Sequence, residues 1–228
     1  MTDDNKEDAA TELLIKEVDE DLRQEQLAQL WKRHGGLLAA AAVAIVLAVA
    51  GWQGWNSWDS KQRQASSLRF AEASALLEQG KKDEAAEALG RLAVVGTKGY
   101  RVLADLRLAD LRQSTGDVAG AVAIYQRLST DSSVDRIYRD MAGIRAGYLT
   151  LDSADPAALD KSMEPLAAES SSWRHSAREI QALAAMRRGD TARAADLFSR
   201  IAEDAAAPQG VRARAAEMLA VTGQRANS

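Results

Sequence analysis

Three stretches of the sequence repeat one pattern: Gly80-Lys81-Lys82-Asp83-Glu84-Ala85-Ala86-Glu87-Ala88-Leu89, Gly116-Asp117-Val118-Ala119-Gly120-Ala121-Val122-Ala123-Ile124-Tyr125 and Gly189-Asp190-Thr191-Ala192-Arg193-Ala194-Ala195-Asp196-Leu197-Phe198. Each has a glycine, an alanine five residues later and a large apolar residue nine residues later. The alanines are 36 and 73 residues apart, and 73 residues hold two periods. A weaker copy is therefore expected between them, and Ser153-Ala154-Asp155-Pro156-Ala157-Ala158 supplies it. Such a fixed period indicates a helical repeat array.

A second alanine precedes each of these by twelve positions, giving Ala73, Ala109, Ala146 and Ala182. Two small residues per unit, one on each helix of a hairpin, allow the helices to cross closely. The glycines are expected to end the first helix with positive φ, and Asp117 or Asp190 to cap the second. The pattern predicts helices over 60–79, 83–94, 99–114, 118–129, 134–150, 156–167, 173–187 and 191–204, with a last helix over 209–221 that covers the end of the array.

The composition supports an all-α fold and excludes several kinds of function. The chain is 46% apolar, only 5% aromatic and has three prolines, and no alternating β-branched runs predict strands. It has no cysteine, which excludes disulfides and thiolate chemistry. Residues 59–228 carry 24 basic and 23 acidic side chains. A nucleic-acid partner is therefore not expected, since it would require a dense basic patch.

One segment is long and apolar enough to cross a membrane. From Gly35 to Trp58 there are 24 uncharged residues, whereas a bilayer core of roughly 30 Å needs about 20. Trp31 precedes this segment and Trp52, Trp55 and Trp58 end it, as in interfacial aromatic belts. The sequence thus predicts an acidic, partly disordered cytoplasmic segment (1–34), a transmembrane helix (35–58) and a repeat domain (59–228).

A cleaved signal peptide is the main alternative, because Ala48-Val49-Ala50 has the form of a cleavage site. Signal peptides begin with a short basic region, whereas here 34 residues with ten acidic and five basic side chains come first. A retained anchor is therefore the better interpretation. Basic residues near the span are slightly more numerous on its N-terminal side, which favours a cytoplasmic N-terminus.

Small residues recur every four positions within the span, at Gly36, Ala40, Ala44 and Ala48. On one face of a helix they would let a second membrane helix approach closely, so they form a candidate packing face. The alternative is that alanine is simply common in this segment.

The repeat units resemble the tetratricopeptide pattern: a helical hairpin of about 34 residues with a small residue on each helix and an aromatic residue four positions after the second. One unit departs from it, because Ser162 replaces the aromatic residue and Pro165 is expected to interrupt the second helix. The larger layout, with Gly51-Trp52-Gln53-Gly54-Trp55-Asn56-Ser57-Trp58 after the span, is similar from about Asp21 onward to the bacterial YfgM-like family. That family consists of ancillary subunits of the SecYEG translocon. The resemblance implies a bacterial inner-membrane protein with a periplasmic domain, whose partners are the translocon, periplasmic chaperones and client proteins.

No pattern in the sequence predicts catalysis. The two histidines, His34 and His175, lack a second ligand at metal-binding spacing, and neither a phosphate loop nor a nucleophile elbow is present. We therefore expect no enzyme activity, cofactor, metal or small-molecule substrate.

Repeat arrays bind partners along a concave surface formed by the first helix of each unit. By analogy with the tetratricopeptide groove, the expected lining is Phe70, Leu77, Leu106, Asp110, Gln113, Asp140, Glu179, Leu183 and Met186. The alternative is that several of these belong to the core between repeats. Two other functional hypotheses remain: an adaptor for cell-envelope assembly or cell division on the same repeats, and a cytoplasmic location of the repeats.

Overall fold

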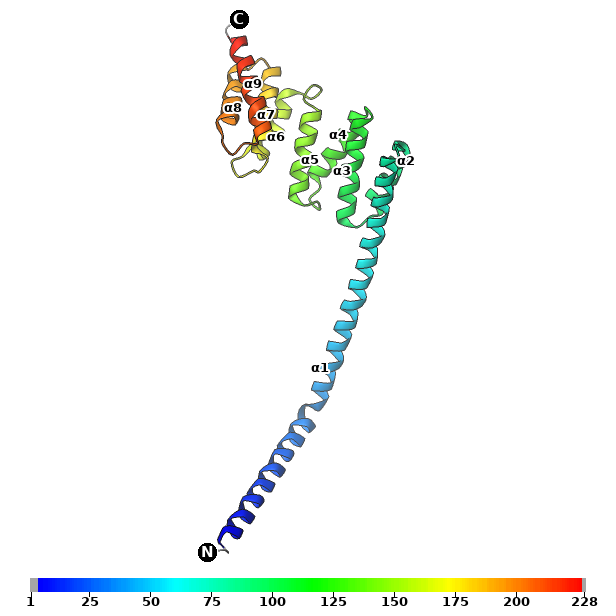
Figure 1. The fold of residues 1–228 in the computed structure, drawn as a ribbon, viewed down its shortest axis with the longest axis vertical. Coiled ribbons are helices and arrows are strands. Elements are labelled where there is room, and N and C mark those ends of the chain that lie inside the picture. Colours follow the sequence, from blue (N-terminus) through cyan, green and yellow to red (C-terminus); the bar gives the residue numbers. More distant parts are fainter. Residues whose placement is uncertain (1–3, 227–228) are drawn as a thin grey trace. The chain divides into compact units, whose positions relative to one another are not determined.

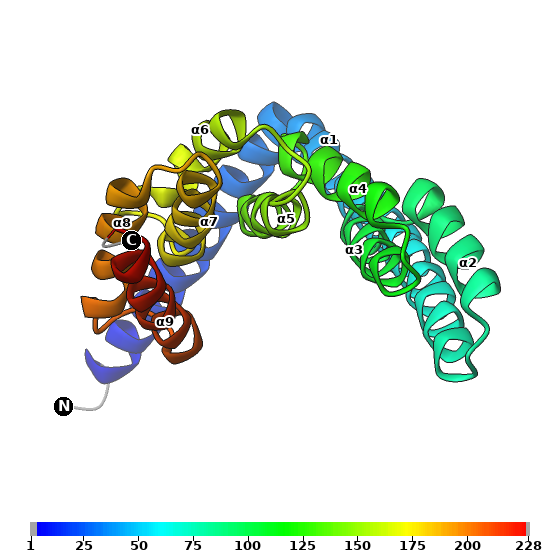
Figure 2. The same cartoon turned by 90° about the horizontal axis from the view of Figure 1, so that it is seen from above.

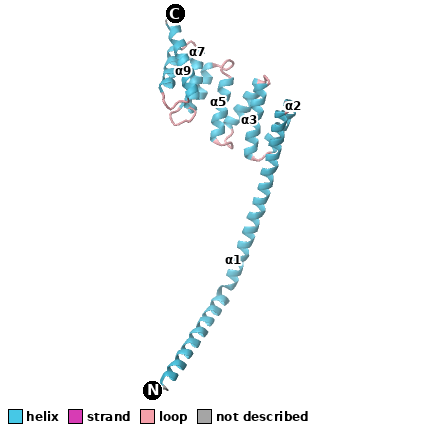
Figure 3. Ribbon diagram, in the orientation of Figure 1, coloured by secondary structure: helices cyan, strands magenta, loops and turns pink. Residues whose placement is uncertain are grey.

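The computed structural model is entirely helical over the residues that it describes, which are 4–226 for the backbone and 32–223 for the side chains (Figure 3). The helices are α1 (Asp4–Glu78), α2 (Lys82–Val95), α3 (Lys98–Ser114), α4 (Val118–Thr130), α5 (Arg136–Leu149), α6 (Pro156–Ala167), α7 (Arg174–Arg187), α8 (Thr191–Glu203) and α9 (Gln209–Ala226). The all-α prediction is confirmed. The bounds of α2 to α8 lie within two residues of those predicted from the sequence.

The chain divides into two compact units, one up to Lys61 and one from Gln62 onward. Helix α1 passes through both. It begins at Asp4, so it includes most of the acidic segment for which partial disorder is predicted. From Gln62 onward α1 supplies the first helix of the repeat domain.

Three of the four hairpins turn through the same motif. The φ angles of Gly80, Gly116 and Gly189 are 74°, 89° and 78°. This left-handed conformation is unfavourable for residues that have a Cβ atom, so glycine is preferred there. After each glycine, a backbone N–H reaches back to the preceding helix; the bond from Asp117 N to Arg112 O is 2.9 Å long. These bonds satisfy carbonyls that the helix end would otherwise leave unpaired.

The aspartates then begin the second helix. The Asp117 side chain accepts a bond from Gly120 N at 2.9 Å, and Asp190 accepts one from Arg193 N at 3.1 Å. Both the glycine turns and the aspartate caps are confirmed.

The repeated alanines lie where paired helices meet. Ala73, Ala85, Ala109, Ala121, Ala182 and Ala194 are all 0% exposed. The large residues four positions further along, Leu89, Tyr125 and Phe198, are at most 1% exposed. A small side chain at the crossing therefore lets the next large one fill the space between helices, which gives the interior its dense packing.

In the third hairpin, α5–α6, the predicted register of the second helix, with Ala158 buried, is wrong. Ala158 is exposed, and its N–H is instead capped by Asp155 at 2.8 Å. The buried positions are Leu159 and Met163, which shifts the pattern by one residue. The large Met163 side chain is accommodated because a glycine, Gly147, faces it; a Cβ there would lie 3.2 Å from the Met163 sulfur and 3.0 Å from Ile180 Cδ1.

The prediction that Pro165 interrupts α6 is wrong, because the helix continues to Ala167. The proline lies in the last turn. It removes only one hydrogen bond there, close to where the helix would end in any case.

The hairpins of the second unit stack side by side into a curved row (Figure 1). Figure 2 shows that the first helices, α3, α5, α7 and the last helix α9, lie along the inner side of this curve. The second helices, α2, α4, α6 and α8, lie along its outer side. The sequence-based assignment of the first helices to one surface therefore matches the fold.

The glycine turns generate a test of stability. Gly189→Ala should lower the free energy of unfolding by about 1–2 kcal/mol, because alanine disfavours the left-handed conformation. Gly99→Ala is the matched control: Gly99 lies in α3 without positive φ, and nothing lies within 4 Å of its Cβ position. Urea unfolding of the full chain in detergent measures both, and equal effects of the two substitutions would contradict this account of the turn.

Candidate protein-binding surface

Two pockets open on the side of the first helices. The α7 pocket has a volume of about 270 Å³ and is lined by Leu151, Asp152, Leu183, Met186, Arg187 and Met218. Two of these, Leu183 and Met186, were predicted from the sequence. Their apolar atoms also pack against the core between α7, α8 and α9. With Met218 they form a flexible, apolar site of the kind that adapts to different side chains.

Arg187 holds the rim of the α7 pocket in place. Its guanidinium donates to the carbonyl oxygens of Ala154 at 2.8 Å and Asp152 at 3.0 Å, and also to that of Leu151. The turn after α5 is thereby attached to the end of α7. This contact joins residues more than 30 positions apart, so no local pattern in the sequence indicates it.

The α3 pocket, of about 320 Å³, contains two further predicted residues, Leu77 and Asp110, together with Lys82, Arg107, Leu111 and Ser114. The Asp110 carboxylate accepts a bond from the Tyr125 hydroxyl at 2.6 Å and lies 3.6 Å from Arg145 Nη1. Burial of the Tyr125 hydroxyl raises its pKa, and the hydrogen bond to Asp110 raises this pKa further. Asp110 therefore joins α3, α4 and α5 as well as lining the pocket.

Five of the nine predicted residues lie outside these two pockets, and three of the five are Phe70, Leu106 and Gln113. Phe70 packs against Tyr100 with ring centroids 6.1 Å apart, and Leu106 packs against the same core cluster. Gln113 is exposed on α3. For Phe70 and Leu106 the structure thus shows the inter-repeat packing that was the alternative interpretation.

Glu179 is a buried anchor between helices. Its side chain is 5% exposed and accepts two bonds from Arg214, at 2.8 and 2.9 Å, and one from the Tyr148 hydroxyl at 2.6 Å. Burial and the contact with Glu179 raise the pKa of Tyr148. The hydrogen bonds to Glu179 also raise the pKa of Arg214. The carboxylate joins α5, α7 and α9, so its oxygens are already occupied by the protein.

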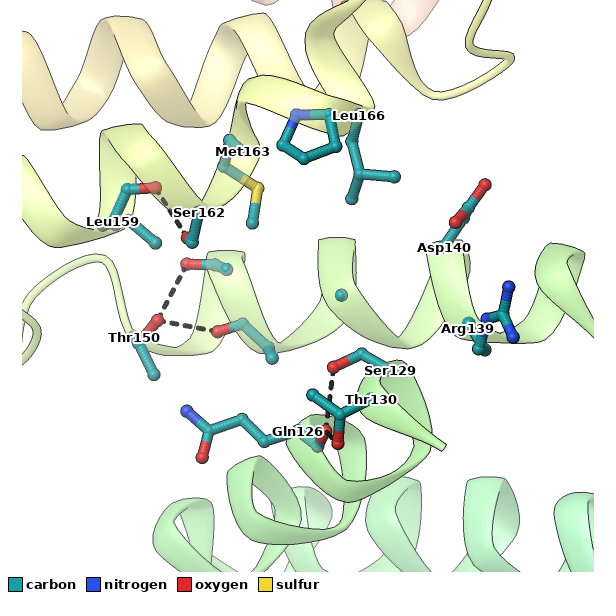
Figure 4. Close-up of a pocket in the computed structure, with 14 residues that line it drawn as sticks. Gln126, Ser129, Thr130, Arg139, Asp140, Thr150, Leu159, Ser162, Met163 and Leu166 are labelled. Carbon is teal, nitrogen blue, oxygen red and sulfur yellow. Dashed lines mark hydrogen bonds between the residues drawn. The ribbon is translucent and has the colours of Figure 1, made fainter. Parts of the chain in front are cut away.

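Asp140 faces a different pocket from the other predicted residues. It lies at one end of the α5 pocket, about 370 Å³, between α4, α5 and α6 (Figure 4). The hydroxyls of Ser129, Thr150 and Ser162 there donate to carbonyls of their own helices. These hydroxyl donors are therefore already used within the protein.

Neither histidine lies in a cluster of metal ligands. Among the described residues there is no group of three or more His, Cys, Asp or Glu side chains placed to hold an ion. His175 Nε2 lies 2.6 Å from the Asp204 carboxylate. This bond, with one from Ala206 N, lowers the pKa of Asp204 to about 2. The pair attaches α7 to the loop before α9.

The model of one protein family, described as a tetratricopeptide repeat-like domain, matches residues 28–218. The chain belongs to this tetratricopeptide repeat-like family. A search of curated proteins found no match. The family assignment agrees with the buried alanine grid and the stacked hairpins, and it makes polypeptides the expected class of ligand.

The same match includes the apolar part of α1. Leu37, Ile45 and Leu47 are 72%, 64% and 67% exposed. This helix is long and apolar enough to cross a membrane, and its side chains are not those of a buried core helix. The candidate packing face, Gly36, Ala40, Ala44 and Ala48, is exposed along it.

Substitution of Arg214 tests how strongly the packing of α9 against α7 depends on the bond to Glu179. Arg214→Met should cost about 2–3 kcal/mol of unfolding free energy, because it leaves a carboxylate buried with only Tyr148 as a partner. Adding Glu179→Gln should recover part of that loss. Arg200→Met is the control: its pair with Asp196 is exposed on both sides, so its cost should be below about 0.5 kcal/mol.

The measurement is urea unfolding of the full chain, followed by circular dichroism. A double variant as unstable as Arg214→Met, or an Arg214→Met variant as stable as the control, would contradict the role given to the buried carboxylate.

Proposed function

We propose that this protein is a membrane-anchored scaffold that binds polypeptide segments along the first helices of its repeat domain. The observation that carries the proposal is the joining of two features in one chain. An exposed apolar helix precedes the domain, and the domain carries a pocket lined by the apolar side chains Leu151, Leu183, Met186 and Met218.

The α7 pocket supports binding of polypeptide rather than of a small molecule. Its volume is small, about 270 Å³, which is at the lower edge of the range for small-molecule sites. Its Leu and Met side chains suit a single large apolar side chain from an extended segment. Asp110, Arg145 and Arg107 further along the inner side provide charged partners for the same segment.

For the cellular role we propose an accessory subunit of the SecYEG translocon in the bacterial inner membrane. The N-terminus is cytoplasmic, and the repeat domain is periplasmic and meets chaperones and emerging clients. The acidic N-terminal segment, the tryptophan-rich end of the apolar segment and the repeat domain support this role through their resemblance to the YfgM-like family. Gly36, Ala40, Ala44 and Ala48 are the proposed contact face toward another membrane helix.

Site-specific crosslinking in membranes tests the proposal. A photoreactive amino acid in place of Leu183 or Met186 should recover translocon subunits, a periplasmic chaperone or secreted clients, because these positions line the α7 pocket. The control position is Arg200 on α8, whose side chain is 64% exposed. Equal products from both surfaces would contradict groove binding. Recovery of only cell-wall or division proteins from the pocket would instead favour an adaptor for envelope assembly.

A further inference from the structure

The large apolar side chains exposed on the repeat domain gather at one end of it. Between Gln62 and Gly223 they are Leu68, Val94, Val95, Leu103, Val118, Ile137, Tyr138 and Val221. All except Val118 and Val221 lie toward the end that contains Gln62, the α2–α3 turn and the α4–α5 loop. We call this the entry end, because the chain enters the domain there (Figure 1).

Four of these residues form what we call the entry-end patch: Val94, Val95, Ile137 and Tyr138. Val94 is 75%, Val95 61% and Ile137 67% exposed. Val94 and Val95 end α2, and Ile137 and Tyr138 lie in the first turn of α5. The α2–α3 turn and the α4–α5 loop beside them are neighbours, since Lys98 Nζ lies 3.6 Å from Asp135 Oδ1. Exposed apolar residues gathered in this way mark a surface that is covered by something else.

The α2–α3 turn is also attached to α1. Thr97 N donates to Ser66 Oγ at 3.1 Å, and Ser66 follows Trp58 by only eight residues. Eight residues rise by about 12 Å in a helix, and even a fully extended chain of that length reaches only about 28 Å. If Trp58 lies at a membrane interface, Ser66 and the turn bonded to it therefore lie within about 28 Å of that interface.

The charge near the patch is slightly positive. Residues 94–101 contain Lys98 and Arg101 and no acidic side chain, whereas residues 131–140 contain two arginines and three aspartates, so the two segments together carry a net charge of +1. Lys98 is paired with Asp135, and Arg136 with Asp140. Apolar residues flanked by cations are typical of segments that lie in the headgroup region, where anionic lipids attract Lys and Arg.

We propose that the entry-end patch inserts into the headgroup region of the bilayer that holds α1. The occupant of the patch is thus lipid and not a second protein. This inference rests on the proposed membrane anchor. Its consequence is a second, peripheral attachment that restrains the repeat domain relative to its tether.

The absence of cysteine allows a direct test. Single Val94→Cys and Ile137→Cys variants of the full chain would carry an environment-sensitive fluorophore, in vesicles of phosphatidylethanolamine and phosphatidylglycerol with a headgroup nitroxide lipid. Both labels should shift to shorter emission wavelengths and lose most of their fluorescence to the nitroxide. Val118→Cys is the matched control, since Val118 is a valine exposed at the opposite end, and its label should remain bright.

Ala44→Cys, within the apolar segment, separates the two proposals. Quenching of a fluorophore at position 44 is measured with a lipid that carries the nitroxide on its acyl chain. A quenched label at 44 with labels at 94 and 137 that behave like 118 would overturn the patch proposal and leave the anchor intact. An unquenched label at 44 would overturn the anchor and the patch together. Unchanged circular dichroism of each variant establishes that the labelled proteins are folded.

Discussion

The close crossing of paired helices at alanine is the constraint on which the repeat domain depends. Ala85, Ala121 and Ala194 are completely buried, and each is followed four residues later by a large side chain that fills the adjoining space. A larger residue at the crossing would separate the helices and leave that space underfilled. Left-handed glycines set where three of the hairpins turn, and aspartate caps follow the glycine in two of these, so that the alanines of the two helices come opposite one another.

Much of this could be predicted from the sequence, because the signals are local. A glycine, an aspartate one residue later and an alanine four residues after that are all close in the chain, and they determine one turn. The register of α6 could not be predicted in this way. The spacing indicated Ala158, whereas the burial of Leu159 and Met163 depends on long-range packing: both share a core cluster with Ile180, and Gly147 leaves room for the Met163 sulfur.

The candidate surface was predictable to a smaller extent. Leu77, Asp110, Leu183 and Met186 line pockets on the side of the first helices, as the repeat pattern indicated. Glu179 shares their spacing but is buried, because Arg214 and Tyr148 reach it from helices 35 and 31 residues away in sequence. Met218 and Arg187 were missed for the same reason. Helical spacing identifies which face a residue occupies, but only tertiary contacts decide whether that face is open. The proposed function therefore combines two levels of organisation: the local repeats would supply a peptide-binding surface, and the apolar helix before them would restrict that surface to a membrane.

The most direct test of the tethered scaffold is the topology of the intact protein in bacterial membranes. Alkaline phosphatase fused to the C-terminus should be active, and the fusion should remain in the membrane pellet after carbonate extraction with its N-terminal residues intact. A protein released into the soluble fraction, or a mature chain that begins at Gly51, would contradict the account. So would an inactive phosphatase in a membrane-bound fusion, because the repeat domain would then lie in the cytoplasm.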